Sequence, residues 1–323
     1  MASQVNTQFL IISVTHGDDL DLGALGAVDV AIHCGDLTEE SKLDEYKSSL
    51  QLLKRIRAPL KLVIAGNHDF TLDTPMFQKK LADIKPPLED ALVKKEYGDF
   101  GEARALFETD DAKAAGIVFL DEGTHSFTLA NGALMKVYAS PYTPSLSDWG
   151  FQYNPQVGHD WSLESKVDVA VTHGPPHGVL DYTDSRKRAG CPGLFAAIAR
   201  AQPKMHCFGH IHERWGAKRV AWHSTISDSP SHFTDIDNDN SVVVESLAGI
   251  RAKKFDTPDV MEEKAVKLER YKEQGCCTAK APVQGDDQTL FINAAIEGPD
   301  EQSQQLPWVV EIDLPMAVKA QRQ

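Results

Sequence analysis

Residues 204–213 read Lys-Met-His-Cys-Phe-Gly-His-Ile-His-Glu, and this stretch decides how the rest of the chain is interpreted. The short apolar run 205–208 is typical of a buried strand, and it ends at a glycine followed at once by His210 and His212. Histidines at the end of a strand are placed to bind a ligand. A lone His-x-His motif is weak evidence, because such pairs also occur on ordinary surfaces.

The same arrangement occurs four more times towards the N-terminus. Apolar, β-branched runs at 9–14, 29–34, 60–65 and 166–171 predict further strands. Each run ends in polar residues beside glycine, in the order Thr15-His16-Gly17, Gly35-Asp36, Gly66-Asn67-His68-Asp69 and Thr172-His173-Gly174. The carboxyl ends of parallel strands meet at one edge of a sheet, so these side chains are expected to surround a common centre.

The residue types at these strand ends favour a metal site. Imidazole suits Zn, Fe, Mn or Ni, and a carboxylate such as Asp36 can bridge two ions. The adjacent glycines allow the backbone to approach a bulky anionic ligand. We therefore predict one or two divalent ions per chain, as Mn²⁺, Fe²⁺/Fe³⁺ or Zn²⁺.

The ordered motifs resemble those of the calcineurin-like metallophosphoesterases, which run D-x-H, G-D, G-N-H-[DE], H and G-H-x-H. The subgroup of metallophosphoesterase-domain-containing (MPPED-like) proteins is the most similar, through the runs 63–68, 172–176, 208–213 and 290–295. The resemblance implies an α/β fold, a four-layer α/β/β/α sandwich. We expect a single domain over 1–323, with insertions at 71–115 and 213–288 and C-terminal strands within 289–315.

The resemblance also implies a role for each motif residue. His16 and His212 would bind the first metal, Asp36 would bridge, and the second metal would be bound by Asn67, His173 and His210. His68 would be catalytic, acting beside the leaving group as an acid or as a donor to a phosphate oxygen. A metal-bound hydroxide would attack phosphorus. This is the chemistry of a phosphodiesterase or a small-molecule phosphatase, and the MPPED-like subgroup suggests a nucleotide phosphodiester as substrate.

Two neighbouring residues are less certain members of the site. His177 follows His173 by four positions in a proline-containing loop, from which it could contact substrate. Asp69 either caps its own turn or orients a ligand. The nearby aromatic residues Trp149, Phe151, Tyr153 and Trp161 could line a substrate site, although burial in the core is the commoner fate of such side chains.

One motif departs from the family. Where the family has Asp-x-His, this chain has Val14-Thr15-His16, and valine cannot ligate a metal. Three interpretations stay open. The chain works with one metal, or with Asp18 or Asp19 supplying the missing oxygen. It is instead a catalytically silent binding protein. Or it is a metal-dependent enzyme that acts on a non-phosphoester small molecule.

The amino-acid composition limits the classes of binding partner and the cellular compartment that we expect. The 323 residues include 47 acidic and 33 basic side chains, and the net charge of −14 disfavours duplex nucleic acid and anionic membrane surfaces. Five cysteines without framework spacing indicate a reducing compartment. The start lacks the basic region of a signal peptide, and no apolar run reaches the ~20 residues of a spanning helix. We expect a cytoplasmic protein with a small-molecule substrate.

The remaining elements are predicted from local patterns. Apolar positions three or four apart indicate a helix over 39–57, with Thr38 as its N-cap. Asn131-Gly132 predicts a hairpin over 126–139. Further helices are expected at 194–201 and 260–274, and the last strands at 289–295 and 308–312.

Overall fold

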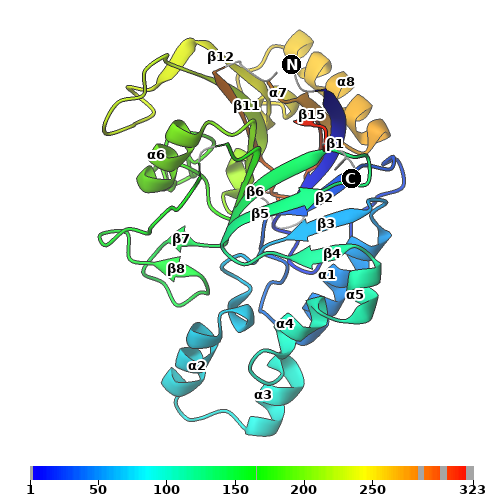
Figure 1. Ribbon diagram of the computed structural model, residues 1–323, viewed down its shortest axis with the longest axis vertical. Helices are drawn as coiled ribbons and strands as arrows, with labels where there is room; N and C mark the ends of the chain where they lie inside the picture. Colours follow the sequence, from blue (N-terminus) through cyan, green and yellow to red (C-terminus); the bar gives the residue numbers. More distant parts are fainter. Residues whose placement is uncertain (1–2, 165, 283–286, 299–303, 318–323) are drawn as a thin grey trace, which may run out of the picture.

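Two β-sheets form the centre of the protein (Figure 1). The computed structural model describes residues 3–164, 166–282, 287–298 and 304–317. The first sheet has the strand order β13-β15-β1-β2-β3-β4. Its strands β1 to β4 run parallel, while β15 is antiparallel to β1. The strands are β1 (Gln4–Ile12), β2 (Val30–His33), β3 (Leu60–Val63), β4 (Ile117–Phe119), β13 (Cys277–Lys280) and β15 (Trp308–Pro315).

The second sheet has the order β12-β11-β14-β10-β9-β6-β5. Its central strands β6, β9, β10 and β14 are parallel, and antiparallel strands flank them on both sides. The strands are β5 (Gly123–Thr128), β6 (Leu134–Ser140), β9 (Val169–Thr172), β10 (Met205–Phe208), β11 (Gly216–Trp222), β12 (Ile236–Ser246) and β14 (Gln288–Asn293). The β5–β6 pair confirms the predicted hairpin. A short parallel pair, β7 (Thr143–Pro144) and β8 (Gln152–Tyr153), stands apart.

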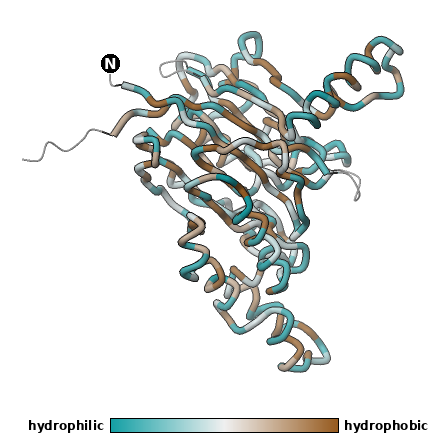
Figure 2. The backbone as a smooth tube through the Cα atoms, turned by 90° about the vertical axis from the view of Figure 1, so that its right-hand side faces the viewer, coloured by the Kyte–Doolittle hydropathy of each residue, from teal (hydrophilic) through white to brown (hydrophobic). Residues whose placement is uncertain are grey.

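Alternation along the strands produces four layers. Inward-facing side chains of both sheets share one core, which includes Phe9, Ile32, Leu62, Val137, Val171 and Ile292. The outer face of the first sheet packs against α1 (Leu43–Arg55), α4 (Glu102–Phe107) and α5 (Asp110–Ala114), and that of the second against α6 (Pro192–Ala201). Hydrophobic residues accordingly follow the strands through the middle of the molecule (Figure 2). The predicted α/β/β/α sandwich is confirmed.

Helix α1 begins later than predicted, and the proposed cap was wrong. Its N-cap is Lys42, where the Glu45 carboxylate accepts from the Lys42 backbone N–H. Thr38 is fully buried, and its hydroxyl donates to Asp69 instead. The Thr38 side chain is therefore used in a tertiary hydrogen bond and not in the helix cap that the local pattern predicted.

The segment 71–115 folds into helices. It contains α2 (Thr74–Asp83), α3 (Asp90–Tyr97), α4 and α5, preceded by the turn η1 (Phe70–Leu72). Phe70, Phe77 and Val93 give it a small core of its own, and α2 and α3 project away from the sheets (Figure 1).

The segment 213–288 cannot be described as an insertion throughout. Strand β11 lies between β12 and β14 inside the second sheet, and β13 pairs with β15 in the first. The turn η2 (His212–Arg214) precedes β11, and α7 (Leu247–Ile250) and α8 (Pro258–Gln274) lie between β12 and β13. In the described ranges, no helix is long and apolar enough to cross a membrane.

Candidate metal centre

The predicted ligands come together at the carboxyl ends of five parallel strands. His16 follows β1, Asp36 follows β2, and Asn67 and His68 follow β3. His173 follows β9, while His210 and His212 follow β10. Three groups of ligand atoms lie within 4.8 Å of one another: His16–Asp36–His68, His16–His212–Glu297 and Asp36–His173–His210. Asp36 belongs to two of these groups, as a bridging carboxylate would.

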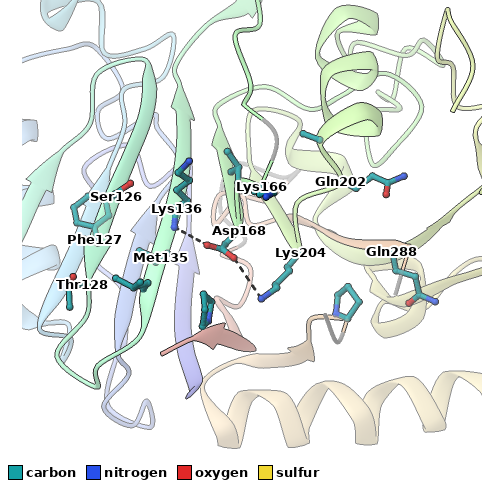
Figure 3. Close-up of a pocket in the computed structure, with 15 residues that line it drawn as sticks. Ser126, Phe127, Thr128, Met135, Lys136, Lys166, Asp168, Gln202, Lys204 and Gln288 are labelled. Carbon is teal, nitrogen blue, oxygen red and sulfur yellow. Dashed lines mark hydrogen bonds and ion pairs between the residues drawn. The ribbon is translucent and has the colours of Figure 1, made fainter. Parts of the chain in front are cut away.

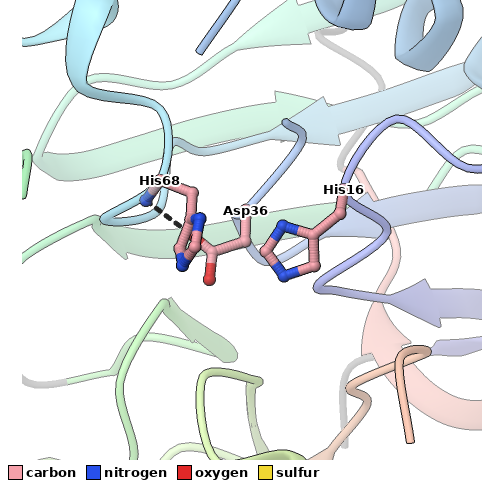
Figure 4. A group of neighbouring side chains, drawn as sticks. All are labelled: His16, Asp36 and His68. Atoms are coloured by element: carbon pink, nitrogen blue, oxygen red, sulfur yellow. Dashed lines mark hydrogen bonds between the residues drawn. The ribbon is translucent and has the colours of Figure 1, made fainter. Parts of the chain in front are cut away.

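The side chains of the first group point towards one another from three separate loops (Figure 4). Two glycines permit this close approach. A Cβ on Gly66 would lie 2.3 Å from the Asp36 carboxylate, and one on Gly209 would lie 2.2 Å from the Ser13 hydroxyl. The loops after β3 and β10 can therefore pack this closely against the residues that follow β2 and β1 only with glycine at these positions.

The second subsite consists of Asn67, His173, His210 and Asp36. Hydrogen-bond acceptor atoms of these side chains face one another. The Nδ1 of His173 lies 2.9 Å from the Cys34 carbonyl, which can only accept, so this nitrogen carries the proton. The Nε2 lone pair then lies 3.0 Å from both the Asp36 carboxylate and the Asn67 amide oxygen. These facing acceptors need either a second proton on His173 or a metal ion between them, and imidazole, carboxylate and amide oxygen are a ligand set that fits a divalent metal.

Burial and charge act in opposite directions on these groups. Burial alone would raise the pKa of the Asp36 carboxyl, but the imidazoles of His173 and His68 hold it well below its usual range. Burial alone would lower the pKa of His173, and the adjacent Asp36 carboxylate raises it. Burial lowers the pKa of His210 to about 3, which keeps this imidazole neutral and able to ligate.

The first subsite, formed by His16, His212 and Glu297 with Asp36, contains a residue that the sequence analysis missed. The Glu297 carboxylate lies 3.0 Å from His16 Nε2 and 3.9 Å from His212 Nδ1. Glu297 lies four residues beyond β14, at the same edge of the sheets as the other ligands. The sequence signal that could have identified Glu297 is a carboxylate two residues after the strand predicted at 289–295. Of the two predicted substitutes, Asp18 and Asp19, the carboxylate of Asp19 is bound by Arg55.

Val14 occupies the position of the missing aspartate. It is fully buried, and its backbone has a φ of 55°. His16, Asp36 and His210 also have positive φ values. The left-handed region is an outlier for a β-branched residue, whereas aspartate enters it more readily. Strained backbone of this kind clusters at functional sites.

His68 lies at the edge of the centre with its ring fixed on two sides. Its Nδ1 donates to the Glu39 carbonyl over 2.7 Å, and its backbone N–H donates to Asp36. Trp149 stacks on the ring, with centroids 4.2 Å apart. The expectation that Trp149 is buried in the core was therefore wrong, since it is partly exposed and contacts a site residue.

Asp69 ties two of the ligand loops together. Its carboxylate accepts from the backbone N–H groups of Gly66, Leu37 and Thr38, and from the Thr38 hydroxyl. Burial and the nearby Asp36 charge raise its pKa to about 6, against the effect of those donors. Asp69 thus sets the spacing between the loops that carry Asp36 and Asn67.

His177 has its contacts elsewhere. Its Nδ1 lies 3.2 Å from the Gly190 carbonyl and 3.7 Å from the Asp181 carboxylate, and its ring packs edge-on against His232. These contacts attach His177 to the 178–190 loop rather than to the grouped ligands, and a substrate role for it stays a prediction.

A large cavity of about 790 Å³ lies at the opposite ends of the strands. Asp168 and Lys204, which precede β9 and β10, line it together with Lys136 (Figure 3). The Asp168 carboxylate accepts from the Lys136 backbone N–H and lies 3.7 Å from the Lys204 ammonium. These charges satisfy one another, and the cavity is remote from the ligands.

Comparison with known proteins agrees with this geometry. Residues 10–214 match the family model described as calcineurin-like phosphoesterase. The chain belongs to this family of metal-dependent phosphoesterases.

Similar proteins include metallophosphoesterase domain-containing protein 1 of Homo sapiens, 32% identical over 65% of this chain and 62% of that protein. A UPF0046 protein of Caenorhabditis elegans is 30% identical over 65% of this chain and 52% of its own length. The chain thus spans between half and two thirds of these relatives. A purple acid phosphatase from yellow lupin (Lupinus luteus) seeds aligns with 90% of this chain and 44% of its own, at 10% identity and a TM-score of 0.37.

Proposed function

We propose that this protein is a metal-dependent phosphohydrolase that cleaves a small phosphodiester or phosphomonoester. The observation that carries the proposal is the set of facing acceptors around Asp36, namely His173 Nε2, the Asn67 amide oxygen and the carboxylate itself. Imidazole, carboxylate and amide donors suit Mn²⁺, Fe or Zn²⁺. When bound, such ions lower the pKa of water and offset charge on the phosphoryl oxygens.

The residues around this centre support a division of roles. Asp36 would contribute to both subsites, with His16 and His212 on one side and Asn67, His173 and His210 on the other. His68 would supply the proton that the leaving oxygen needs. With Nδ1 bound to the Glu39 carbonyl, a protonated ring has its other N–H, at Nε2, free to donate, and it returns to the neutral Nδ1–H tautomer.

The substrate is proposed to be a small molecule in the cytoplasm, with nucleotide phosphodiesters as the first class to test. The net charge of −14 supports a small ligand over duplex nucleic acid or membrane. Trp149, stacked on His68 and partly exposed, offers an aromatic face close to the proposed acid.

The test compares hydrolysis of bis(p-nitrophenyl) phosphate and p-nitrophenyl phosphate by chelator-treated protein reloaded with Mn²⁺. We expect turnover of at least one ester by the parent and none by Asp36→Asn. Asp121→Asn makes the same chemical change at a carboxylate paired with Arg104 far along the chain, and should leave turnover intact. A parent that binds metal yet hydrolyses neither ester would overturn the proposal in favour of a silent binding protein or a non-phosphoester enzyme.

A further inference from the structure

We propose that Glu297 replaces the aspartate missing at Val14 and serves as the carboxylate ligand of the first metal. This inference rests on the metal centre of the proposed function and assigns it a ligand from outside the five motifs. Glu297 Oε2 lies 3.0 Å from His16 Nε2, and Glu297 Oε1 lies 3.9 Å from His212 Nδ1. The glutamate therefore contacts both histidines of the first subsite.

The backbone holds Glu297 beside the residue whose role it would take. Beyond β14 the chain continues alongside the end of β1, with a parallel bridge between Ala295 and Ser13. The Ile296 N–H donates to the Ser13 carbonyl over 2.8 Å, and the Glu297 N–H donates to the Val14 carbonyl over 3.1 Å. Glu297 is thus hydrogen-bonded to Val14 itself, and its longer side chain reaches the ligands from the adjacent strand.

The other side of this segment is also paired. Glu297 forms an antiparallel bridge with Gln304, and the Gln305 N–H donates to the Ile296 carbonyl over 2.6 Å. The carboxylate is therefore presented by a segment paired on both edges. Its side chain is 31% exposed, so the ion would remain open to water on this side.

The proton positions on His16 require one more positive charge between its ring and Glu297. His16 Nδ1 lies 2.9 Å from the Thr38 carbonyl, an acceptor, so this nitrogen carries the proton. In the neutral ring the Nε2 lone pair then faces the Glu297 carboxylate over 3.0 Å. Two acceptors at this distance need either a second proton on His16 or a metal ion between them, and a measurement of Mn²⁺ binding distinguishes the two.

The other nearby carboxylates are less suited to this position. Asp19 is engaged by Arg55, and Asp18 is exposed. Glu39 also lies 3.0 Å from His16, but on the Nδ1 side, where the nitrogen already donates to Thr38. Glu39 is therefore a matched control for Glu297. It has the same side chain at the same distance from His16, but it contacts Nδ1, the nitrogen that carries the proton.

The test measures Mn²⁺ binding to chelator-stripped protein by titration calorimetry and by the magnetic coupling of paired ions in electron paramagnetic resonance. We expect two ions in the parent and in Glu39→Gln. Glu297→Gln should retain the second ion and lose the coupled signal. Its affinity for the first ion should fall by more than the roughly 10- to 100-fold that follows loss of an outer hydrogen-bond partner.

A rescue variant completes the design. Val14→Asp combined with Glu297→Gln should regain two ions, because it restores the carboxylate at the family position. Equal thermal stability of all variants in chelator would show that folding is unaffected. Two ions bound unchanged by Glu297→Gln, or one ion in both proteins, would overturn this inference while leaving hydrolysis by the second subsite to be judged from turnover. A parent that binds no ion would overturn both proposals.

Discussion

The two subsites share Asp36 but differ in how the chain builds them. The second subsite is the more enclosed, since the side chains of His173 and Asp36 are almost fully buried. In the first subsite, His212 and Glu297 have side-chain exposures of 27% and 31%, and the proposed carboxylate comes from outside the motifs. Under the proposed assignment, the exposed side of the centre has exchanged one carboxylate ligand for another, whereas the ligands of the buried side are held by the core.

Substitution of Asp36, which both subsites share, should remove the difference between the two subsites. Asp36→Asn is expected to reduce metal content from two ions to none and to bring turnover below detection, because the bridging carboxylate supplies charge to both sides. Elemental analysis of the purified variant measures this effect. Full retention of either ion would mean that Asp36 is not shared.

Changing His68 should affect rate while sparing both ions. His68→Gln keeps a side chain of similar reach but cannot deliver a proton at Nε2, and we expect turnover to fall by about 10²- to 10⁴-fold. Metal content measured in parallel is the control. Loss of an ion together with the rate would identify His68 as a ligand, as its grouping with His16 and Asp36 allows.

The two subsites should lose their metal ions at different rates. The ion on the open side, near His212 and Glu297, should leave first on addition of excess chelator. The second ion should follow in a slower phase, because burial limits access of water and chelator. Stopped-flow detection of Mn²⁺ release tests this order. A single phase, or a fast phase that disappears in His210→Ala but persists in Glu297→Gln, would contradict it.

The smallest effects are expected from a buried histidine next to each subsite, and they concern the pH dependence of stability. Beneath each subsite lies a fully buried histidine, His33 hydrogen-bonded to Thr15 and His206 hydrogen-bonded to Thr172. Burial lowers the pKa of each to about 3. In the unfolded chain each is protonated below about 6.5. Stability is therefore fully present above pH 6.5 and falls as the pH drops from there towards 3.

Each buried histidine should contribute a loss of about 1.5 kcal/mol in the free energy of unfolding between pH 6.5 and 5. His33→Gln and His206→Gln remove the titration and keep a hydrogen-bonding side chain, so each should reduce that loss by this amount. Urea denaturation at both pH values, in chelator to exclude metal effects, measures it. An unchanged pH slope in either variant would refute the assignment.

The strand-end motifs could be read from the sequence alone, and the sandwich and the proposed ligand roles followed from the family that those motifs resemble. Glycine-bounded apolar runs predict buried parallel strands, and the polar residues at their ends converge because parallel strands end at one edge. His16, Asp36, Asn67, His173, His210 and His212 could be named for this reason. Their local spacing carries the information.

The contacts between distant parts of the chain could be found only in the folded structure. Glu297 reaches His16 across 281 positions because β14 and β1 end side by side, although they belong to different sheets. Trp149 reaches His68, and Thr38 leaves the predicted helix cap for Asp69, for the same kind of reason. Local pattern records which residues a strand end carries, whereas the packing of the two sheets determines which strand ends meet.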